Sequence, residues 1–275
     1  MRRNLWLIAI LVVLLLSAGS PQLALAQNTL SPASLPADCL PVGKLFGDVG
    51  YYAKNLKTGQ VLMYRPDNIF AAASTIKVPV SIVVYRHFYK QADPALRAVY
   101  DTGVELMMTI SENDYFAEFL DEIEDSIGPA VIREHFSRLG MQHTTIRDAQ
   151  AREAFGYSNV TTARDMALIF EQLYRGNLLG PEKTKFMLDA MANSIFPDEM
   201  ARHLQSRKVI HKIGELDDVL ADVGVVEGPG GPILISIFTE TPQEGDYASD
   251  FIAALSACLY SRLSGEPITF TWPAN

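Results

Sequence analysis

The spacing of apolar and polar residues changes twice along the chain. Near the start, "VGYYAKNL" and "QVLMYR" have the composition of strands, and Lys57-Thr58-Gly59 between them predicts a hairpin turn. Strand patterns return late in the chain in "RKVIHKIG", "VLADVGVVEG" and "PILISIFTE", with a tight glycine-rich turn at 228–231. We therefore predict strands at about 48–65 and 207–240.

Between these two groups of strands, apolar residues recur at helical spacing. The helical segments are "TIKVPVSIVVYRHFYK", "DYFAEFLDEI", "PAVIREHFSRLG", "TTARDMALIFEQLYRG" and "PEKTKFMLDAMANSI", and a last helix is expected from about Tyr247 to Leu263. This order predicts an α+β fold, in which an antiparallel sheet built from both chain ends is flanked by helices. An all-helical subdomain, about 70–200, is inserted between the second and third strands.

The first 26 residues have the features of a secretory signal peptide. Arg2 and Arg3 precede an apolar run over 5–16, and small residues ending in "ALA" follow at 24–26. The alternative is an uncleaved membrane anchor, but the run is shorter than the ~20 residues that span a bilayer. We expect cleavage of 1–26, a Pro/Ser-rich leader over 27–40 and one domain over 41–275, exported to a periplasm or out of the cell.

Composition argues against several kinds of partner. The formal net charge is −9, and it becomes −11 when Arg2 and Arg3 leave with the signal peptide. Such a chain repels nucleic acid and anionic lipid, and no stretch after residue 27 is long and apolar enough to span a membrane. We expect a monomer without nucleic-acid or membrane partners.

Neither a metal nor another cofactor is expected. The histidines show no H-x-H pairing and no carboxylate partner at ligand spacing; they are His87, His135, His143, His203 and His211. His211 is adjacent to Lys212, and one interpretation is that it tunes the charge of this lysine. Alternation along a strand favours the other, a side chain that points to the opposite face.

Two cysteines occur in the chain, Cys39 near the mature start and Cys258 in the last predicted helix. In an exported protein an even count suggests a disulfide, and chain ends often lie close together. The alternative is two buried free thiols. Both cysteines are structural in either case.

The candidate chemistry begins in "FAAASTIKVPVSI", residues 70–82, where Ser74 and Lys77 lie three positions apart in an apolar segment. In a helix that begins near Ser74 the two side chains share a face, with the serine at the positive end of the helix dipole. Burial favours the neutral form of a lysine, and a neutral amine beside a hydroxyl is a general base for a serine nucleophile. The alternative is a helix-capping serine and a lysine that extends to the surface.

Two further motifs accompany the pair. "SEN" at 111–113 offers a second hydroxyl and a carboxamide, and "HKIG" at 211–214 brings a second amine next to a glycine. In this order the elements resemble those of the class A serine β-lactamase family, which is related to the D-alanyl-D-alanine peptidases known as penicillin-binding proteins. The resemblance covers essentially the whole mature chain, but only the Ser74–Lys77 motif matches completely.

The resemblance implies a role for each residue. Ser74 attacks an amide or β-lactam carbonyl and becomes acylated, Lys77 accepts its proton, and Ser111 relays a proton to the leaving nitrogen. Asn113 holds the substrate amide and contacts Lys77, while Lys212 supplies positive potential toward a substrate carboxylate and toward Ser111. The expected substrate is a β-lactam or a small molecule similar to a peptidoglycan stem.

The same resemblance places the substrate-binding strand at Ile213, Gly214 and Glu215. The backbone N–H groups of Ser74 and Glu215 would form an oxyanion hole, which stabilises the transition state by a few kcal/mol. Ile213 stands where the family has a threonine, so a hydrogen bond worth roughly 1.5–3 kcal/mol to a substrate carboxylate is missing. The following strand has Asp222 and no arginine, which further weakens the binding of anions.

A second departure concerns the step that releases the acyl group. The family places a glutamate in an E-x-x-L-N segment, whereas this chain has "RDAQAREAFGYSN", whose only glutamate is Glu153. Glu153 is a weak candidate for the deacylation base, and the alternative is that it lies in solvent. Asn159 and Asp165, which flank the start of the next helix, are interpreted as capping and surface residues.

Three functions are consistent with these observations. The first is an exported serine hydrolase of class A β-lactamase type that acts on β-lactams or related amides, slowly if the deacylation base is absent. The second is a D,D-peptidase or esterase on the same scaffold. The third is a non-catalytic binding module, which Ile213 and the missing glutamate favour but the retained Ser74–Lys77 pair opposes.

Overall fold

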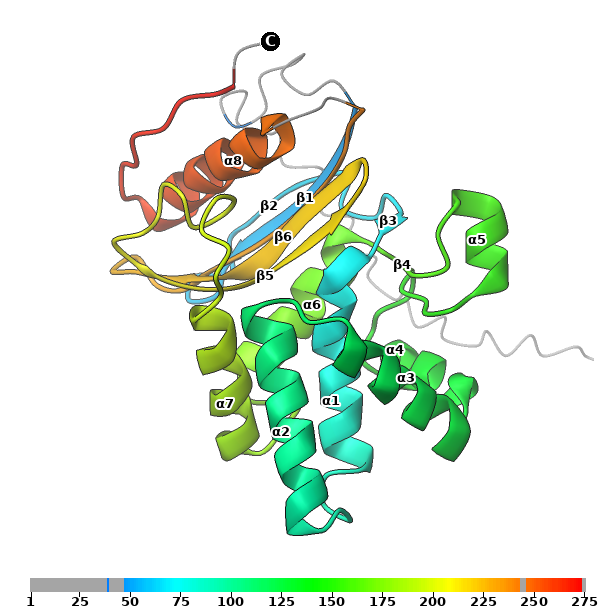
Figure 1. The fold of residues 1–275 in the computed structure, drawn as a ribbon. Coiled ribbons are helices and arrows are strands. Elements are labelled where there is room, and N and C mark those ends of the chain that lie inside the picture. The colour runs from blue at the N-terminus through cyan, green and yellow to red at the C-terminus, as the bar shows by residue number, and fades with distance from the viewer. Residues whose placement is uncertain (1–38, 40–46, 243–245, 274–275) are drawn as a thin grey trace, which may run out of the picture. The chain divides into compact units, whose positions relative to one another are not determined.

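A computed structural model describes residue 39, residues 47–242 and residues 246–273. Its main sheet has five antiparallel strands in the order β2-β1-β7-β6-β5, so strands from both ends of the chain pair at its centre (Figure 1). This confirms the predicted α+β fold. The strands are β1 (Asp48–Asn55), β2 (Val61–Tyr64), β5 (Lys208–Leu216), β6 (Val219–Glu227) and β7 (Ile233–Glu240).

A second, two-stranded sheet joins β3 (Phe70–Ala71) to β4 (Val160–Thr161). The sequence pattern did not predict these strands, because two residues are too few to show an alternation. Their pairing holds the segment that leads into residue 74 against the segment that ends near residue 159. The small sheet therefore fixes the entrance to the helical region.

Helices cover both faces of the main sheet, and alternate side chains of its strands bury into two cores. On one face, Val49, Ile235 and Ile237 pack with α8, and on the other face Val223 and Phe238 pack with the helical region. Figure 1 shows α8 alone on its side of the sheet, while α6 and α7 lie on the opposite side. Two-sided burial explains why the late strands are almost continuously apolar.

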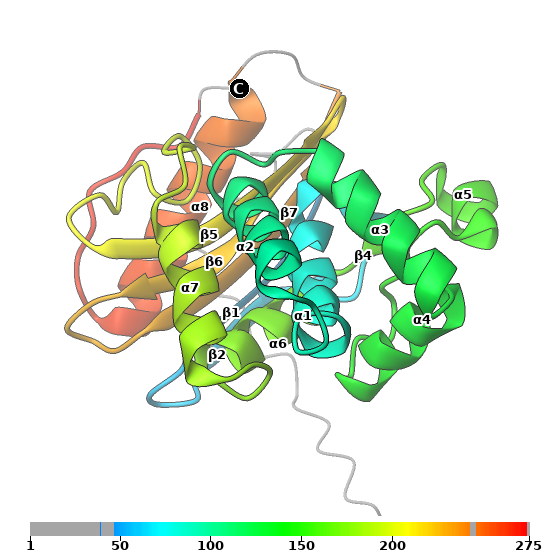
Figure 2. The same ribbon diagram turned by 60° about the horizontal axis from the view of Figure 1, so that its bottom comes forward.

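The helical region is built around α1, whose residues from Lys77 to Tyr85 are all buried. Figure 2 shows α1 between α2 and the pair formed by α3 and α4. A helix that is apolar all round is buried on every side, which explains why this segment has no polar stripe. The helices are η1 (Ala73–Ile76), α1 (Lys77–His87), α2 (Pro94–Thr109), α3 (Asp114–Ser126), α4 (Pro129–Arg138), α5 (Ala149–Phe155), α6 (Ala163–Tyr174), α7 (Pro181–Ala192) and α8 (Tyr247–Ser264).

The sequence pattern did not pick out α2 or α5. Within α2, Gly103 interrupts the helical pattern, and the structure gives the reason for a glycine there. A Cβ at this position would lie 2.6 Å from the ring of Phe119 and 2.7 Å from the ring of Tyr115, both on α3. The glycine costs helix propensity but lets α2 and α3 pack closely.

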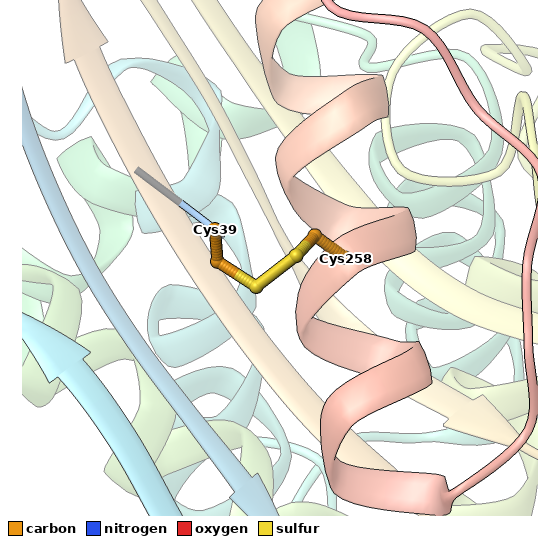
Figure 3. Close-up of a disulfide and its surroundings, with 2 residues drawn as sticks. All are labelled: Cys39 and Cys258. Atoms are coloured by element: carbon orange, nitrogen blue, oxygen red, sulfur yellow. A yellow bond between two sulfur atoms is a disulfide. The ribbon is translucent and has the colours of Figure 1, made fainter. Parts of the chain in front are cut away.

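A disulfide joins Cys39 to Cys258 on α8, with the two Cα atoms 5.6 Å apart (Figure 3). The structure thus contains the first of the two alternatives left open by the sequence. The bond closes a loop with a sequence separation of 219 residues. It ties the start of the domain to the helix that covers one face of the sheet.

The predicted signal peptide, 1–26, and all of the leader except Cys39 lie outside the described residues. Within the residues that the structure describes, no helix has both the length and the apolar character needed to cross a membrane.

Candidate active site

Ser74 lies on η1, immediately before α1, at the floor of a cleft of about 380 Å³. The preceding residue, Ala73, has a φ of +43°, in the left-handed region that non-glycine residues rarely adopt. Ser111 also has a positive φ, +60°. Backbone strain of this kind persists only where the surrounding structure enforces it, and it concentrates at functional sites.

Lys77 brings together the residues of the first two motifs. Its side chain is 1% exposed, and its Nζ lies 2.9 Å from Ser74 Oγ. The same nitrogen donates to the Ser111 carbonyl oxygen at 2.6 Å and to Asn113 Oδ1 at 2.7 Å, with Ser111 Oγ 3.2 Å away. The alternative interpretation, in which the Lys77 side chain extends to the surface, is therefore wrong.

The partners of Lys77 suit a neutral amine. The Ser111 carbonyl and Asn113 Oδ1 can only accept hydrogen bonds, so they use the two N–H groups that a neutral amine has. The nitrogen lone pair is then left for the hydroxyl proton of Ser74. An ammonium is also satisfied, because its third N–H can be donated to Ser74 Oγ. Both protonation states fit the same geometry.

Lys212 is a second lysine in contact with the Ser111 hydroxyl. Its Nζ donates to Ser111 Oγ at 2.9 Å and to the Ile213 carbonyl oxygen at 2.9 Å, and its side chain is 1% exposed. The hydroxyl of Ser111 thus lies between two lysine amines. The geometry allows a proton to pass among Lys77, Ser111 and Lys212.

Burial depresses the basicity of both lysines. It lowers the pKa of Lys77 to about 8. Burial and the nearby charge of Lys77 together lower the pKa of Lys212 to about 7, although Asp222 opposes the change. Two ammonium groups around one hydroxyl repel each other, so the neutral form of one amine is accessible near neutral pH.

Gly214 lets β5 run close beside the nucleophile. A Cβ at this position would lie 3.1 Å from the backbone nitrogen of Ser74 and 3.0 Å from the Cβ of Ala73. This close approach places Glu215, the next residue, on the wall of the cleft. Ile213, the residue before Gly214, is 5% exposed.

The opposite wall of the cleft comes from α5 and the segment after it. It includes Arg152, Tyr157, Ser158 and Asn159, whereas Glu153 is exposed and does not line the cleft. The structure therefore does not bring the candidate deacylation base to Ser74. Among the described residues that line the cleft, Glu215 is the one carboxylate.

Asp165 is not the surface or capping residue that the sequence suggested. It is 3% exposed, and its carboxylate accepts from the backbone nitrogens of Gln142 and His143 and from Thr144 Oγ1. The N-cap of α6 is Thr162, whose Oγ1 accepts from the Asp165 backbone. Asp165 instead holds the segment after α4 against α6.

Asn159 has a structural role at the edge of the site. Its carbonyl accepts from the Ala72 backbone at 2.9 Å, and its Oδ1 accepts from the Arg147 backbone at 2.8 Å. These bonds close the base of the 147–159 segment beside the nucleophile. Asn159 therefore shapes the cleft wall and does not cap a helix.

His211 has a carboxylate partner that spacing along the sequence did not indicate. His211 Nδ1 lies 2.9 Å from both carboxylate oxygens of Asp222, and both side chains are buried. Sequence spacing missed the pair because Asp222 reaches His211 from the neighbouring strand. Across the described residues, no group of three or more His, Cys, Asp or Glu side chains is arranged to hold a metal ion.

The fold and the juxtaposition of Ser74, Lys77, Ser111, Asn113 and Lys212 define the class of β-lactamase and transpeptidase-like serine hydrolases. Residues 42–95 and 99–263 match the model of the Beta-lactamase enzyme family. The chain belongs to that family.

Solved structures share the fold at low sequence identity. A β-lactamase from Sphaerobacter thermophilus is 22% identical with a TM-score of 0.68, covering 84% of this chain and 96% of its own. PBP-A is 24% identical with a TM-score of 0.70, covering 82% of this chain and 93% of its own. A mutant of PBP-A, solved as an acyl-enzyme complex with penicillin G, is 24% identical with a TM-score of 0.68, covering 79% and 90%. No curated protein sequence matches the chain.

Proposed function

We propose that this protein is an exported serine hydrolase of class A β-lactamase type, which forms an acyl-enzyme at Ser74 with a β-lactam or a related amide. The observation that carries the proposal is the buried Lys77 amine, 2.9 Å from Ser74 Oγ and held by two groups that can only accept. A lysine of this kind has a free lone pair for the serine proton when it is neutral. A surface lysine would not have this function.

Acylation proceeds by one proton relay. Ser74 Oγ forms a bond to the carbonyl carbon of the substrate while Lys77 takes the hydroxyl proton. As the carbon–nitrogen bond breaks, Ser111 gives its own proton to the leaving nitrogen and is reprotonated by Lys77, 3.2 Å away. The backbone N–H groups of Ser74 and Glu215 stabilise the oxyanion. Proton transfer by a positioned side chain contributes typically ~10²–10⁴-fold to the rate.

Deacylation is slow in this proposal. Water that attacks the acyl-ester must lose a proton, and a base on the 147–159 side of the cleft would have to accept it. Glu153 does not line the cleft, and Glu215 lies on the β5 side. The acyl-enzyme therefore persists, and turnover of β-lactams is limited by its hydrolysis.

This protein binds the substrate carboxylate less strongly than family members that have a threonine at the position of Ile213. The cations beside the cleft are Lys212 and, on the opposite wall, Arg152. Ile213 adds no hydroxyl, and Asp222 is buried against His211. A missing hydrogen bond to a charged group costs about 1.5–3 kcal/mol. We therefore propose that penicillins acylate the protein but bind weakly.

A fluorescent penicillin tests the proposal. The purified protein is incubated with it, and intact mass and nitrocefin colour are followed over time, with Ser74→Ala as the control. The expected result is an adduct at Ser74 that decays slowly and is absent from Ser74→Ala. The enzymatic proposal fails if neither an adduct nor colour appears and a serine-reactive phosphonate also leaves Ser74 unlabelled, as expected of a non-catalytic binding module.

A D,D-peptidase or esterase on the same scaffold is the second candidate, and the lack of a carboxylate on the 147–159 wall favours it. Such an enzyme passes its acyl group to an acceptor and does not need a fast hydrolytic step. An adduct with no measurable decay, together with cleavage of a D-alanyl-D-alanine peptide or a thioester, would select this function over β-lactam hydrolysis.

A further inference from the structure

Strand β5 carries two ionisable residues side by side on opposite faces. Lys212 points toward Ser111 of the candidate active site, whereas His211 lies on the face of the sheet that α8 covers. The proposed mechanism gives His211 no role, although it is 2% exposed. A buried ionisable side chain next to a catalytic lysine needs a physical explanation.

The sheet accommodates the imidazole by a specific arrangement. Gly224 on β6 stands opposite His211 in the register, and a Cβ there would lie 2.6 Å from the His211 Cβ and 2.4 Å from the Ile210 carbonyl oxygen. Two positions before Gly224, Asp222 reaches the imidazole diagonally. The glycine leaves room for the ring at the point where the carboxylate can reach it.

Asp222 is fully buried and its carboxylate is held from two directions. Both oxygens lie 2.9 Å from His211 Nδ1, and Oδ2 also accepts from the Met200 backbone nitrogen at 3.0 Å. In the register of β5 and β6, Asp222 is opposite Ile213, one residue from Lys212. The carboxylate therefore lies behind the strand that presents Lys212 to the cleft.

The charged groups that act on His211 come from three places. Asp222 comes from β6, Glu199 from the segment before β5, and Lys212 from its own strand. Glu199 is 8% exposed, and its carboxylate accepts from Ser249 on α8 at 3.0 Å. Burial raises the pKa of Glu199, and the charge of Asp222 raises it further.

The electrostatics link the pair to the cleft. Burial lowers the pKa of His211, but the charge and hydrogen bond of Asp222, together with the charge of Glu199, raise it above the usual value. Burial and the charge of Lys77 lower the pKa of Lys212, and Asp222 opposes both. Asp222 is thus the group that favours the charged forms of both His211 and Lys212.

We propose that His211 and Asp222 form a buried proton-sensitive pair, which regulates from behind β5 the charge that Lys212 presents to the substrate. The two are positioning residues that act through Lys212. When His211 is protonated, its positive charge cancels the negative charge of Asp222. The carboxylate then does little to stabilise the ammonium form of Lys212. When His211 loses its proton at higher pH, the uncompensated carboxylate holds the ammonium of Lys212. The pair therefore extends the range of pH over which the cleft stays positive.

Titration of Lys212 by NMR tests the coupling in the free protein. With labelled lysine and histidine side chains, the protonation midpoints of Lys212 and His211 are followed in the wild type and in Asp222→Asn. The midpoint of Lys212 is expected to fall by on the order of one pH unit in the variant, as for a charge several ångströms away at an intermediate dielectric. An unchanged Lys212 midpoint would overturn the proposal.

His211→Gln provides the second test, which serves equally if Asp222→Asn fails to fold. Removing the imidazole leaves the carboxylate uncompensated at every pH, so the midpoint of Lys212 is expected to rise. The matched control is Ser236→Ala, a change at a fully buried β7 residue whose hydroxyl has no hydrogen-bond partner among the residues that the structure describes. If His211→Gln lowers only the thermal stability and leaves the Lys212 midpoint at the control value, the pair is structural and the proposal is wrong.

A regulatory role for the His211–Asp222 pair rests on the proposed function of the cleft. A second measurement, the rate of acylation, separates a failure of the proposed function from a failure of the coupling to Lys212. The rate of acylation by a penicillin is measured against pH for the same variants. In Asp222→Asn its alkaline limit is expected to move to lower pH together with the Lys212 midpoint. A shift of the NMR midpoint in a protein that no penicillin labels would contradict the proposed function but leave the coupling intact. If penicillin labels the protein but the Lys212 midpoint is the same in the wild type and in Asp222→Asn, the proposed function stands and the coupling is contradicted.

Discussion

Lys77 Nζ and Asn113 Oδ1 are 2.7 Å apart, which ties the first residue of α1 to the residue that precedes α3. This bond fixes the amine in the direction of Ser74. It also matters that the acceptor is an uncharged carboxamide. A neutral acceptor orients Lys77 without favouring its ammonium form over its amine.

Replacement of this carboxamide by a carboxylate tests that interpretation. In Asn113→Asp a negative charge next to Nζ favours the ammonium and raises the pKa of Lys77, so the pH at which acylation begins is expected to rise by about one to three units. The measurement is the second-order rate of penicillin acylation against pH. Asn113→Ala is the control, in which the rate falls without this shift. Equal profiles for Asn113→Asp and wild type would contradict a role for Lys77 as base.

The absent hydroxyl at position 213 gives a second prediction. Ile213→Thr adds a donor for the substrate carboxylate and is expected to speed acylation by benzylpenicillin about tenfold, the lower end of the effect of a charged hydrogen bond. The control is Ile213→Val, because valine has almost the shape of threonine but no hydroxyl. Its rate of acylation by benzylpenicillin should not exceed that of the wild type. If the two variants are equally fast, the carboxylate argument is wrong.

A third prediction concerns the persistence of the acyl-enzyme. Ser158 lines the cleft on the wall that lacks a carboxylate. Ser158→Glu is expected to shorten the lifetime of the penicillin adduct at least about tenfold, because a positioned general base contributes ~10²–10⁴-fold. Ser158→Gln, which has the same size and no basic oxygen, should leave the lifetime unchanged. Equal lifetimes in the two variants would show that deacylation is not limited by a missing base.

The disulfide gives a prediction about stability. Loss of the Cys39–Cys258 bond frees a loop with a sequence separation of 219 residues, which in the chain-entropy model costs up to about 5 kcal/mol of unfolding free energy. The double variant with serine at both positions is expected to unfold at lower denaturant concentration than the oxidised wild type. Acylation at Ser74 should be retained below the unfolding transition, because the bond lies on the α8 side of the sheet. An unchanged transition midpoint would contradict a stabilising bond.

Much of the fold could be predicted from the sequence because its signals are local. Alternating apolar runs mark β5, β6 and β7, and the last helix was expected at 247–263 and is observed at Tyr247–Ser264. The Ser74–Lys77 pair is also local, since residues one helical turn apart share a face. The companion residues at 111, 113 and 212 could be found by the order of motifs, and tertiary packing then brings them around Lys77.

The features that could not be predicted depend on contacts between distant segments. The burial of Asp165 comes from three donors in the segment 142–144, which no spacing rule connects to α6. The His211–Asp222 pair depends on the register of two strands and on Gly224 opposite the imidazole. The remote position of Glu153 follows from the path of the 147–159 segment, which carries no periodic pattern.

The central claim is that the Lys77 amine takes the proton of Ser74, and the pH dependence of Ser74 acylation tests it most directly. Burial lowers the pKa of Lys77 to about 8, so its neutral fraction grows with pH below that value and is nearly complete above it. Labelling of Ser74 by a fluorescent penicillin, measured from pH 6 upward, is expected to accelerate with pH as Lys77 loses its proton, and to reach its alkaline limit where Lys212 loses its positive charge. Lys77→Arg, which cannot lose its proton in this range, should remove the labelling. A rate that is flat across the range, or a Lys77→Arg variant labelled as fast as the wild type, would contradict the account.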